Sequence, residues 1–184
     1  MEQEREVRYK VDKVIWDSVL SVTEPLKPKM HTLDITFGAY GFNSLERTGR
    51  IFRIRQKESL IALEIKRRTS ENSWLEEKIK LESVKQGFSF LKLSGLEPYL
   101  YLERNREIRK YKNLIICLDD FELLGKFVEI EFQNSNEAEL NEFLNICKIH
   151  GEPQALYGDI VKSLLETNAD FKNSFEIKLS EVIS

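Results

Sequence analysis

The sequence predicts an α+β domain in which most strands run antiparallel. Segments in which apolar and charged residues strictly alternate, the pattern of half-buried strands, recur along the chain. Between them lie segments whose apolar residues are three or four positions apart, as in amphipathic helices. Strands and helices do not follow the regular rhythm of βαβ units, which disfavours a parallel sheet. The 184 residues suit a single domain over residues 1–184 with one hydrophobic core.

The alternating segments define the expected strands. In the first, Val7 and Tyr9 alternate with Arg8 and Lys10. The segment Pro25-Leu26-Lys27-Pro28 is interpreted as a loop, because it has two prolines within four residues. The predicted strands lie around residues 7–11, 52–55, 63–66, 76–82, 100–106 and 128–132.

The helical segments complete the fold prediction. For the helix predicted around residues 140–147, Asn136 and Glu139 have the spacing of an N-terminal capping box. Residues 166–184 are expected to form a C-terminal amphipathic helical extension with Asp170 as its cap. The other helices are predicted around residues 14–19, with Val14 on the apolar stripe, and around 84–91, 140–147 and 156–164.

Composition and charge exclude several classes of protein. The chain has 28 basic and 31 acidic residues, a formal net charge of −3 that gives no reason to expect nucleic-acid binding. The longest apolar run, residues 114–118, is far shorter than the roughly 20 residues of a membrane-spanning helix. The charged N-terminal segment does not resemble a signal peptide, so a cytoplasmic location is expected. Cys117 and Cys147 are interpreted as core residues.

The polar faces of the predicted strands carry almost only full charges, nine basic and six acidic. One interpretation is an ordinary antiparallel sheet whose charged face meets water. The other is a barrel whose charged side lines a water-filled lumen suited to a polyphosphate, with bases on phosphate oxygens and carboxylates holding Mg²⁺ or Mn²⁺. The charged residues are Glu6, Arg8, Lys10, Arg53, Arg55, Glu64, Lys66, Glu76, Lys78, Lys80, Glu82, Arg104, Arg106, Glu129 and Glu131.

Residues 118–131, LDDFELLGKFVEIE, resemble the "LD…GLG.FxEIE" signature of the CYTH superfamily. This superfamily comprises class IV adenylate cyclases, thiamine triphosphatases and inorganic triphosphatases, together called triphosphate tunnel metalloenzymes. Weaker resemblances to other family motifs follow in the family's order, so that the likeness covers residues 6–165. They are Glu6-x-Arg8-x-Lys10 (ExExK), Asp34-Ile35-Thr36-Phe37 (D.YF), Phe52-Arg53-Ile54-Arg55 (LRIR), Leu63-Glu64-Ile65-Lys66 (LTxKG), Glu103-Arg104-Asn105-Arg106 (EKxR), and Tyr157 with Leu164-Leu165 (Y..LL).

The resemblance implies an eight-stranded antiparallel β-barrel that forms a tunnel, with helices on its outside. It implies that Glu6, Glu129 and Glu131 hold Mg²⁺ or Mn²⁺. Lys10 and Asp119 would have catalytic roles, although a role at the strand end is equally open for Asp119. The residues expected to bind the triphosphate are Lys10, Arg53, Arg55, Lys66, Arg104 and Arg106, with Lys78 and Lys80 as additions outside the family pattern.

Two motifs depart from the family pattern. Arg8 occupies the place of the second acid of ExExK, and Lys78 and Lys80 occupy the acidic places of an RxExE strand, unless Glu77 or Glu82 is the counterpart. Each lost carboxylate removes a ligand oxygen and a negative charge, which weakens metal binding. Arg8 could instead pair with one of the remaining acids.

Three functions are therefore compatible with the sequence. The first is a metal-dependent phosphohydrolase acting on tripolyphosphate, thiamine triphosphate or a nucleoside triphosphate. The second is a class IV adenylate cyclase that converts ATP to cyclic AMP and pyrophosphate. The third is a degenerate CYTH domain that binds polyphosphate or an organophosphate without turnover. In each case the expected partner is a small phosphate-bearing molecule, without nucleic acid or membrane, and the protein is expected to be a monomer or homodimer.

Overall fold

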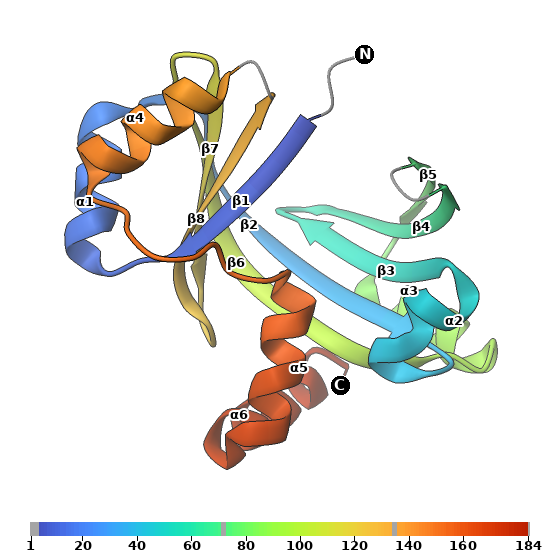
Figure 1. The fold of residues 1–184 in the computed structure, drawn as a ribbon. Helices are drawn as coiled ribbons and strands as arrows, with labels where there is room; N and C mark the ends of the chain where they lie inside the picture. Colours follow the sequence, from blue (N-terminus) through green and yellow to red (C-terminus); the bar gives the residue numbers. More distant parts are fainter. Residues whose placement is uncertain (1–3, 71–72, 134–135, 184) are drawn as a thin grey trace. The chain divides into compact units, whose positions relative to one another are not determined.

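The computed structural model describes residues 4–70, 73–133 and 136–183. These residues form eight strands, six α-helices and one short 3-10 helix, η1 (Figure 1). In chain order the elements are β1 (Glu4–Lys10), α1 (Lys13–Val22), β2 (Glu24–Gly38), η1 (Gly41–Asn43), α2 (Ser44–Thr48), β3 (Arg50–Lys57), β4 (Leu60–Ser70), β5 (Ser73–Leu81), α3 (Val84–Leu93), β6 (Glu97–Tyr111), β7 (Leu114–Phe121), β8 (Gly125–Gln133), α4 (Glu137–Cys147), α5 (Tyr157–Thr167) and α6 (Ala169–Ile183).

The eight described strands form one antiparallel sheet in the order β1-β8-β7-β6-β2-β3-β4-β5. The predicted α+β fold with eight antiparallel strands and flanking helices is therefore confirmed. The order is linear, so the described pairing does not close the sheet into the barrel that the resemblance implies. The chain divides into two compact units, a first of residues 1–31 and 104–156 and a second of residues 32–103 and 157–184.

The core of the first unit lies between the sheet and two helices. One face of β1, β7 and β8 is apolar and packs against α1 and α4 (Figure 1). Val128 and Ile130 of β8 contribute to this face, and Val19 of α1 and Phe143 of α4 are fully buried against it. Since side chains alternate between the faces of a strand, the charged residues of the same strands lie on the opposite face.

Both helices of the first unit differ in detail from the prediction. Asp12 caps α1 by accepting a hydrogen bond from the backbone N–H of Ile15 at 2.9 Å. Val14 is 77% exposed, so it does not belong to the buried stripe of α1. Asn136 occupies the N-cap position of α4 but makes no cap hydrogen bond. The predicted capping box is therefore wrong, because Glu139 instead accepts hydrogen bonds from Asn113 at the β6–β7 turn.

In the second unit, α3 packs closely on the sheet. A Cβ atom at Gly87 of α3 would lie 2.5 Å from Cδ1 of Leu81 and 3.0 Å from Cδ1 of Ile54, so a larger residue here would require these side chains to shift. The predicted C-terminal helix exists as α6, and its buried Phe175 packs edge-on against Tyr101 of β6.

The cap of α6 and the start of β2 correct two further predictions. The side-chain oxygen of Asn168, and not that of Asp170, accepts from the backbone N–H of Phe171 at 3.0 Å. Residues 25–28, predicted as a loop, belong to β2. The β2–β3 ladder runs only from Thr32 to Phe37, so the two prolines lie outside it and remove no N–H from that ladder. No described helix is long and apolar enough to cross a membrane.

Candidate functional site

The charged face of the first unit carries a group of ion-paired side chains, here called the first cluster. The ladders place Arg8 of β1 opposite Glu129 of β8, and Arg106 of β6 opposite Asp119 of β7. All of these positions are on the face that turns away from α1 and α4. The first cluster consists of Glu6, Arg8, Arg104, Arg106, Asp119 and Glu129.

Arg8 joins two of the carboxylates that the sequence predicts as metal ligands. Its Nε and Nη2 donate to Oε2 of Glu129 at 3.2 and 3.1 Å, and Nη2 also donates to Oε1 of Glu6. Its Nη1 lies 3.5 Å from the backbone oxygen of Ala155. Arg8 and Glu129 are 6% and 5% exposed, so this ion pair is buried. The alternative that Arg8 pairs with an acid is confirmed.

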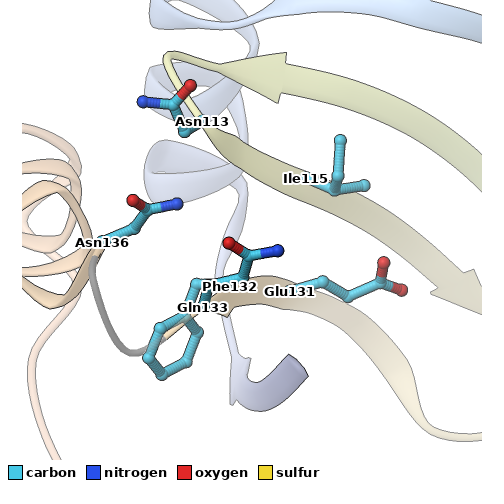
Figure 2. Close-up of a pocket in the computed structure, with 6 residues that line it drawn as sticks. All are labelled: Asn113, Ile115, Glu131, Phe132, Gln133 and Asn136. Atoms are coloured by element: carbon cyan, nitrogen blue, oxygen red, sulfur yellow. The ribbon is translucent and has the colours of Figure 1, made fainter. Parts of the chain in front are cut away.

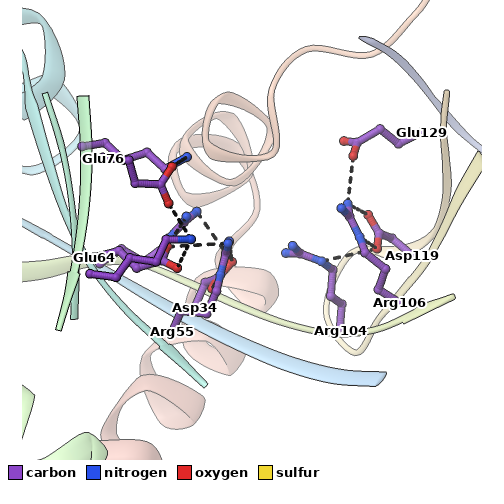
Figure 3. A network of polar contacts seen from close by, with 11 residues as sticks. Asp34, Arg55, Glu64, Glu76, Arg104, Arg106, Asp119 and Glu129 are labelled. Atoms are coloured by element: carbon purple, nitrogen blue, oxygen red, sulfur yellow. Dashed lines mark hydrogen bonds and ion pairs between the residues drawn. The ribbon is translucent and has the colours of Figure 1, made fainter. Parts of the chain in front are cut away.

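Asp119 is held by two arginines of β6. Arg106 donates from Nε and Nη2 to the two oxygens of Asp119, the first at 2.6 Å, and Nη2 also reaches Oε1 of Glu129 at 2.9 Å (Figure 3). Nε of Arg104 lies 3.3 Å from Oδ1 of Asp119. Asp119 is fully buried. Both oxygens of Glu129 therefore accept hydrogen bonds from arginines, Oε1 from Arg106 and Oε2 from Arg8.

Arg8 and Arg106 remain charged despite their burial, because their pKa values are raised. Burial by itself lowers the pKa of Arg8, but the charges of Glu129 and Glu6 outweigh it and raise that pKa above its ordinary value. Burial likewise opposes the charge of Arg106, while the hydrogen bonds and charge of Asp119 raise its pKa. The cluster is thus a balanced set of three cations and three anions.

The second unit carries a separate group, here called the second cluster, on one face of β2 to β5. The ladders place Arg55 opposite Asp34, Arg53 opposite Glu64, and Glu64 opposite Lys78. Four members are basic and three are acidic, so the group has a surplus of positive charge. Its residues are Asp34, Arg53, Arg55, Glu64, Lys66, Glu76 and Lys78.

Glu64 is the centre of the second cluster (Figure 3). Arg53 donates to its Oε2 from Nε at 2.9 Å and from Nη2, Nη1 of Arg55 lies 3.6 Å from the same oxygen, and Nζ of Lys78 lies 3.3 Å from Oε1. Burial by itself raises the pKa of Glu64. The charges of Arg53 and Arg55 lower this pKa by more than burial raises it, so the net shift is downward. Arg55 also binds both oxygens of Asp34, at 2.6 and 2.7 Å.

At the β4–β5 side of the second cluster, Glu76 accepts from two lysines. Nζ of Lys78 lies 2.8 Å from Oε1 and Nζ of Lys66 lies 3.0 Å from Oε2. The hydrogen bond from Lys78 is the largest cause that lowers the pKa of Glu76, which falls to about 2. Lys66 and Lys78, both predicted as triphosphate ligands, therefore share one carboxylate.

Two predicted phosphate ligands lie outside these clusters. Lys10 and Lys80 are exposed, and neither makes an ion pair within residues 4–70, 73–133 and 136–183. The structure conversely adds two buried acids that the sequence analysis did not assign to the site, Asp34 and Glu64, each 3% exposed. The alternation that places Glu64 on the same face as Lys66 was the available signal for Glu64.

Two of the three predicted metal ligands, Glu129 and Glu131, lie close to the thiol of Cys117. One ligand atom each of Cys117, Glu129 and Glu131 lies within 4.8 Å of the others. Cys117 and Cys147 are both 1% exposed, so the prediction that they are core residues is confirmed. Burial raises the pKa of the Cys117 thiol to about 12. Glu131 also lines a cavity of about 510 Å³ together with Asn113, Ile115, Phe132, Gln133 and Asn136 (Figure 2).

The donor chemistry of the three predicted metal ligands fits Mg²⁺ or Mn²⁺. Glu6, Glu129 and Glu131 offer hard carboxylate oxygens, and Glu6 and Glu131 stand opposite each other in the β1–β8 ladder. Like charges opposite each other on neighbouring strands favour a cation between them. In the structure the cation beside Glu6 and Glu129 is the guanidinium of Arg8.

Solved structures of low sequence identity share the fold. A protein from Pyrococcus horikoshii OT3 aligns with a TM-score of 0.64 and 24% identity, covering 88% of this chain and 99% of that one. A putative adenylyl cyclase from Hippeastrum, described as having a dominant triphosphatase activity, aligns with a TM-score of 0.61 and 19% identity. The alignment covers 89% of this chain and 96% of that one. A putative adenylate cyclase from Vibrio parahaemolyticus aligns with a TM-score of 0.60 and 16% identity, covering 88% of this chain and 98% of that one.

Sequence comparisons identify the family. No curated protein sequence matches this chain. The profile of the CYTH domain matches residues 2–162, which is most of the chain and includes every strand and both charged clusters. The sequence motifs in residues 6–165, the fold and the profile agree, and the chain belongs to the CYTH domain family.

Proposed function

We propose that this protein is a phosphohydrolase that acts on a triphosphate, either tripolyphosphate, thiamine triphosphate or a nucleoside triphosphate. The observation that carries the proposal is the composition of the two clusters within a CYTH domain. Buried or half-buried arginines stand on the same strand faces as carboxylates, and the second cluster has a surplus of positive charge. Such an arrangement suits a polyanion better than a neutral ligand.

The proposed phosphate ligands are the basic residues of each unit. A guanidinium presents five N–H donors in a planar fork, so Arg53 or Arg55 can keep one contact to a carboxylate and donate another to a phosphate oxygen. Lys10 and Lys80 offer ammonium groups that make no ion pair in the described part of the chain. The full proposed set is Lys10, Arg53, Arg55, Lys66, Lys78, Lys80, Arg104 and Arg106.

Glu6, Glu129 and Glu131 are the proposed ligands of Mg²⁺ or Mn²⁺. When bound, such an ion would neutralise charge on phosphate oxygens and polarise a water molecule. Asp119 has a different proposed role. Because it is fully buried and both of its oxygens accept from Arg106, it would orient that guanidinium rather than touch the substrate.

A specific observation favours a second candidate, binding of a triphosphate without turnover. Both oxygens of Glu129 are engaged by arginines, and a carboxylate so engaged is a poor ligand for a divalent ion. In this candidate the same basic residues bind the phosphates, and the carboxylates only position them.

A ³¹P NMR time course distinguishes the candidates. Purified protein is incubated with tripolyphosphate and, separately, with ATP, each with Mn²⁺ or Mg²⁺ at mildly alkaline pH. Orthophosphate with a diphosphate product supports the phosphohydrolase. Pyrophosphate with cyclic AMP from ATP would replace it by the cyclase activity that the name of the Vibrio relative suggests. Bound but unchanged triphosphate would favour the second candidate. The cytoplasmic location and the monomeric or homodimeric state remain predictions.

A further inference from the structure

One cation, the guanidinium of Arg8, is shared by two carboxylates of opposite strands. Nη2 of Arg8 donates to Glu6 on the same strand and also, at 3.1 Å, to Glu129 on β8. Nε adds a second bond to the same oxygen of Glu129 at 3.2 Å. Arg8 is therefore bound at the place where the two carboxylates come together.

Water has little access to the ion pair of Arg8 and Glu129. Its side chain is 7% exposed and that of Glu129 is 6% exposed, whereas the side chain of Glu6 is 47% exposed. An unpaired charge at Glu129 would be costly because the site is buried. Arg106 pairs with Oε1 of Glu129 at 2.9 Å, and Arg8 supplies the cationic partner of the other oxygen, Oε2.

We propose that Arg8 is an internal competitor of the divalent cation. Its guanidinium bridges Oε1 of Glu6 and Oε2 of Glu129, so an ion that binds both of these oxygens has to displace Arg8. The proposal rests on the assignment of Glu6 and Glu129 as metal ligands in the proposed function. A tethered group competes with a high effective concentration, in the millimolar range or above, so the competition lowers the affinity for the ion substantially.

The competition is specific to Arg8 and not to positive charge in general. Lys10 lies two residues further along β1, on the same face of the strand and with the same charge, but it makes no ion pair in the described residues. Removing Lys10 changes the local charge as much as removing Arg8 does, yet it frees no carboxylate. Lys10 is therefore the matched control.

The test is a titration of the full chain with Mn²⁺ in the absence of any phosphate. The concentration of free Mn²⁺ is measured by electron paramagnetic resonance at each step, which gives the Kd for the ion. Mn²⁺ is the probe because it prefers oxygen ligands, which keeps Cys117 out of the measurement. We expect Arg8→Gln to bind Mn²⁺ at least about ten-fold more tightly than the natural chain, the factor expected when one charged hydrogen-bonded partner is lost. Lys10→Gln should change the affinity by less than about three-fold, a bound set by weak charge interactions at exposed sites.

Two more variants make the result decisive. Arg8→Lys retains the charge but lacks the fork that reaches both carboxylates, so its Mn²⁺ affinity should lie between those of the natural chain and Arg8→Gln. If Arg8→Gln does not fold, Arg8→Lys takes its place in the comparison. Adding Glu129→Gln to Arg8→Gln should remove the gain, because it removes the released carboxylate.

Unchanged Mn²⁺ affinity in the folded Arg8 variants, or an equal gain in Lys10→Gln, would overturn the competition. Since no phosphate is present, this failure is separate from that of the proposed function. Turnover of a triphosphate with unchanged Mn²⁺ affinity in the Arg8 variants would leave the phosphohydrolase intact and reject the role of Arg8.

Discussion

Arg8 of β1 and Glu129 of β8 stand opposite each other in an antiparallel ladder, and two nitrogens of the guanidinium donate to one carboxylate oxygen. Arg8 stands at a position where the family pattern has an acid, and Glu129 is predicted to bind a metal. It explains why the departure at Arg8 does not leave an isolated charge. The basic residue neutralises the carboxylates that an ion would otherwise neutralise.

Arg53 is the clearest single test of phosphate binding in the second cluster. Its fork already contacts Glu64, and a phosphate oxygen would accept its remaining N–H groups. Arg53→Ala should weaken tripolyphosphate binding by about 1.5 to 3 kcal/mol, the contribution of a hydrogen bond to a charged group. Isothermal titration calorimetry measures the effect, with the exposed Arg67→Ala on the other face of β4 as control. Equal Kd values for Arg53→Ala and the natural chain would place Arg53 outside the site.

Glu64 should matter mainly for stability. Its buried carboxylate is surrounded by Arg53, Arg55 and Lys78, and neutralising it leaves these cations facing one another. Glu64→Gln should lower the free energy of unfolding by about 1 to 3 kcal/mol, as measured by urea denaturation. The exposed Glu77→Gln on β5 serves as control. If both variants unfold at the same urea concentration, the ion pairs of Glu64 contribute no net stability.

Sequence reasoning recovered the faces of the strands but not the partners of their side chains. The alternation in β3 and β4 placed Arg53 and Lys66 correctly on a charged face, because the period of two is a property of the strand itself. Which residues meet across strands depends on register, which the hydrophobic pattern and the turns fix only once it is known which strands pair. Thus the pairing of Arg8 was an open alternative, and the central position of Glu64 was missed.

The predictions that failed did so where local signals compete. Asp170 and Asn168 are both good capping residues, and Asn168 is the cap because α6 begins at Ala169, directly after it. The prolines of residues 25–28 indicate a loop, but they belong to β2 and lie outside its ladder with β3, so they remove no N–H from that ladder.

Glu76 should titrate at unusually low pH. Its pKa is lowered to about 2, first by the hydrogen bond from Lys78, so its ion pairs stabilise the fold above pH 4.5 and are lost as the pH falls toward 2. NMR of the side-chain ¹³C carboxyl resonance should give a midpoint near 2, and Lys78→Met should move it upward. A midpoint near 4.5 in the natural chain would mean that Lys66 and Lys78 do not hold Glu76.

The two thiols should be unreactive in the folded protein. Burial raises the pKa of Cys117 to about 12 and that of Cys147 to about 11, so both stay protonated near pH 8. Iodoacetamide should label neither at pH 8 until urea unfolds the chain, as read by mass spectrometry of peptides. Rapid labelling of Cys117 in the native protein would contradict its burial beside Glu129 and Glu131.

The most direct test of the central claim compares the natural chain with Glu129→Gln. Release of orthophosphate from tripolyphosphate is followed with Mn²⁺ and after chelation, with the exposed Glu122→Gln as control. Because metal polarisation supplies several kcal/mol in such reactions, Glu129→Gln should reduce the metal-dependent rate by at least about 10²-fold, while Glu122→Gln retains it. A Glu129→Gln variant that hydrolyses tripolyphosphate at the natural rate would contradict the assignment of Glu129 and, with it, the proposed metal-dependent phosphohydrolase site.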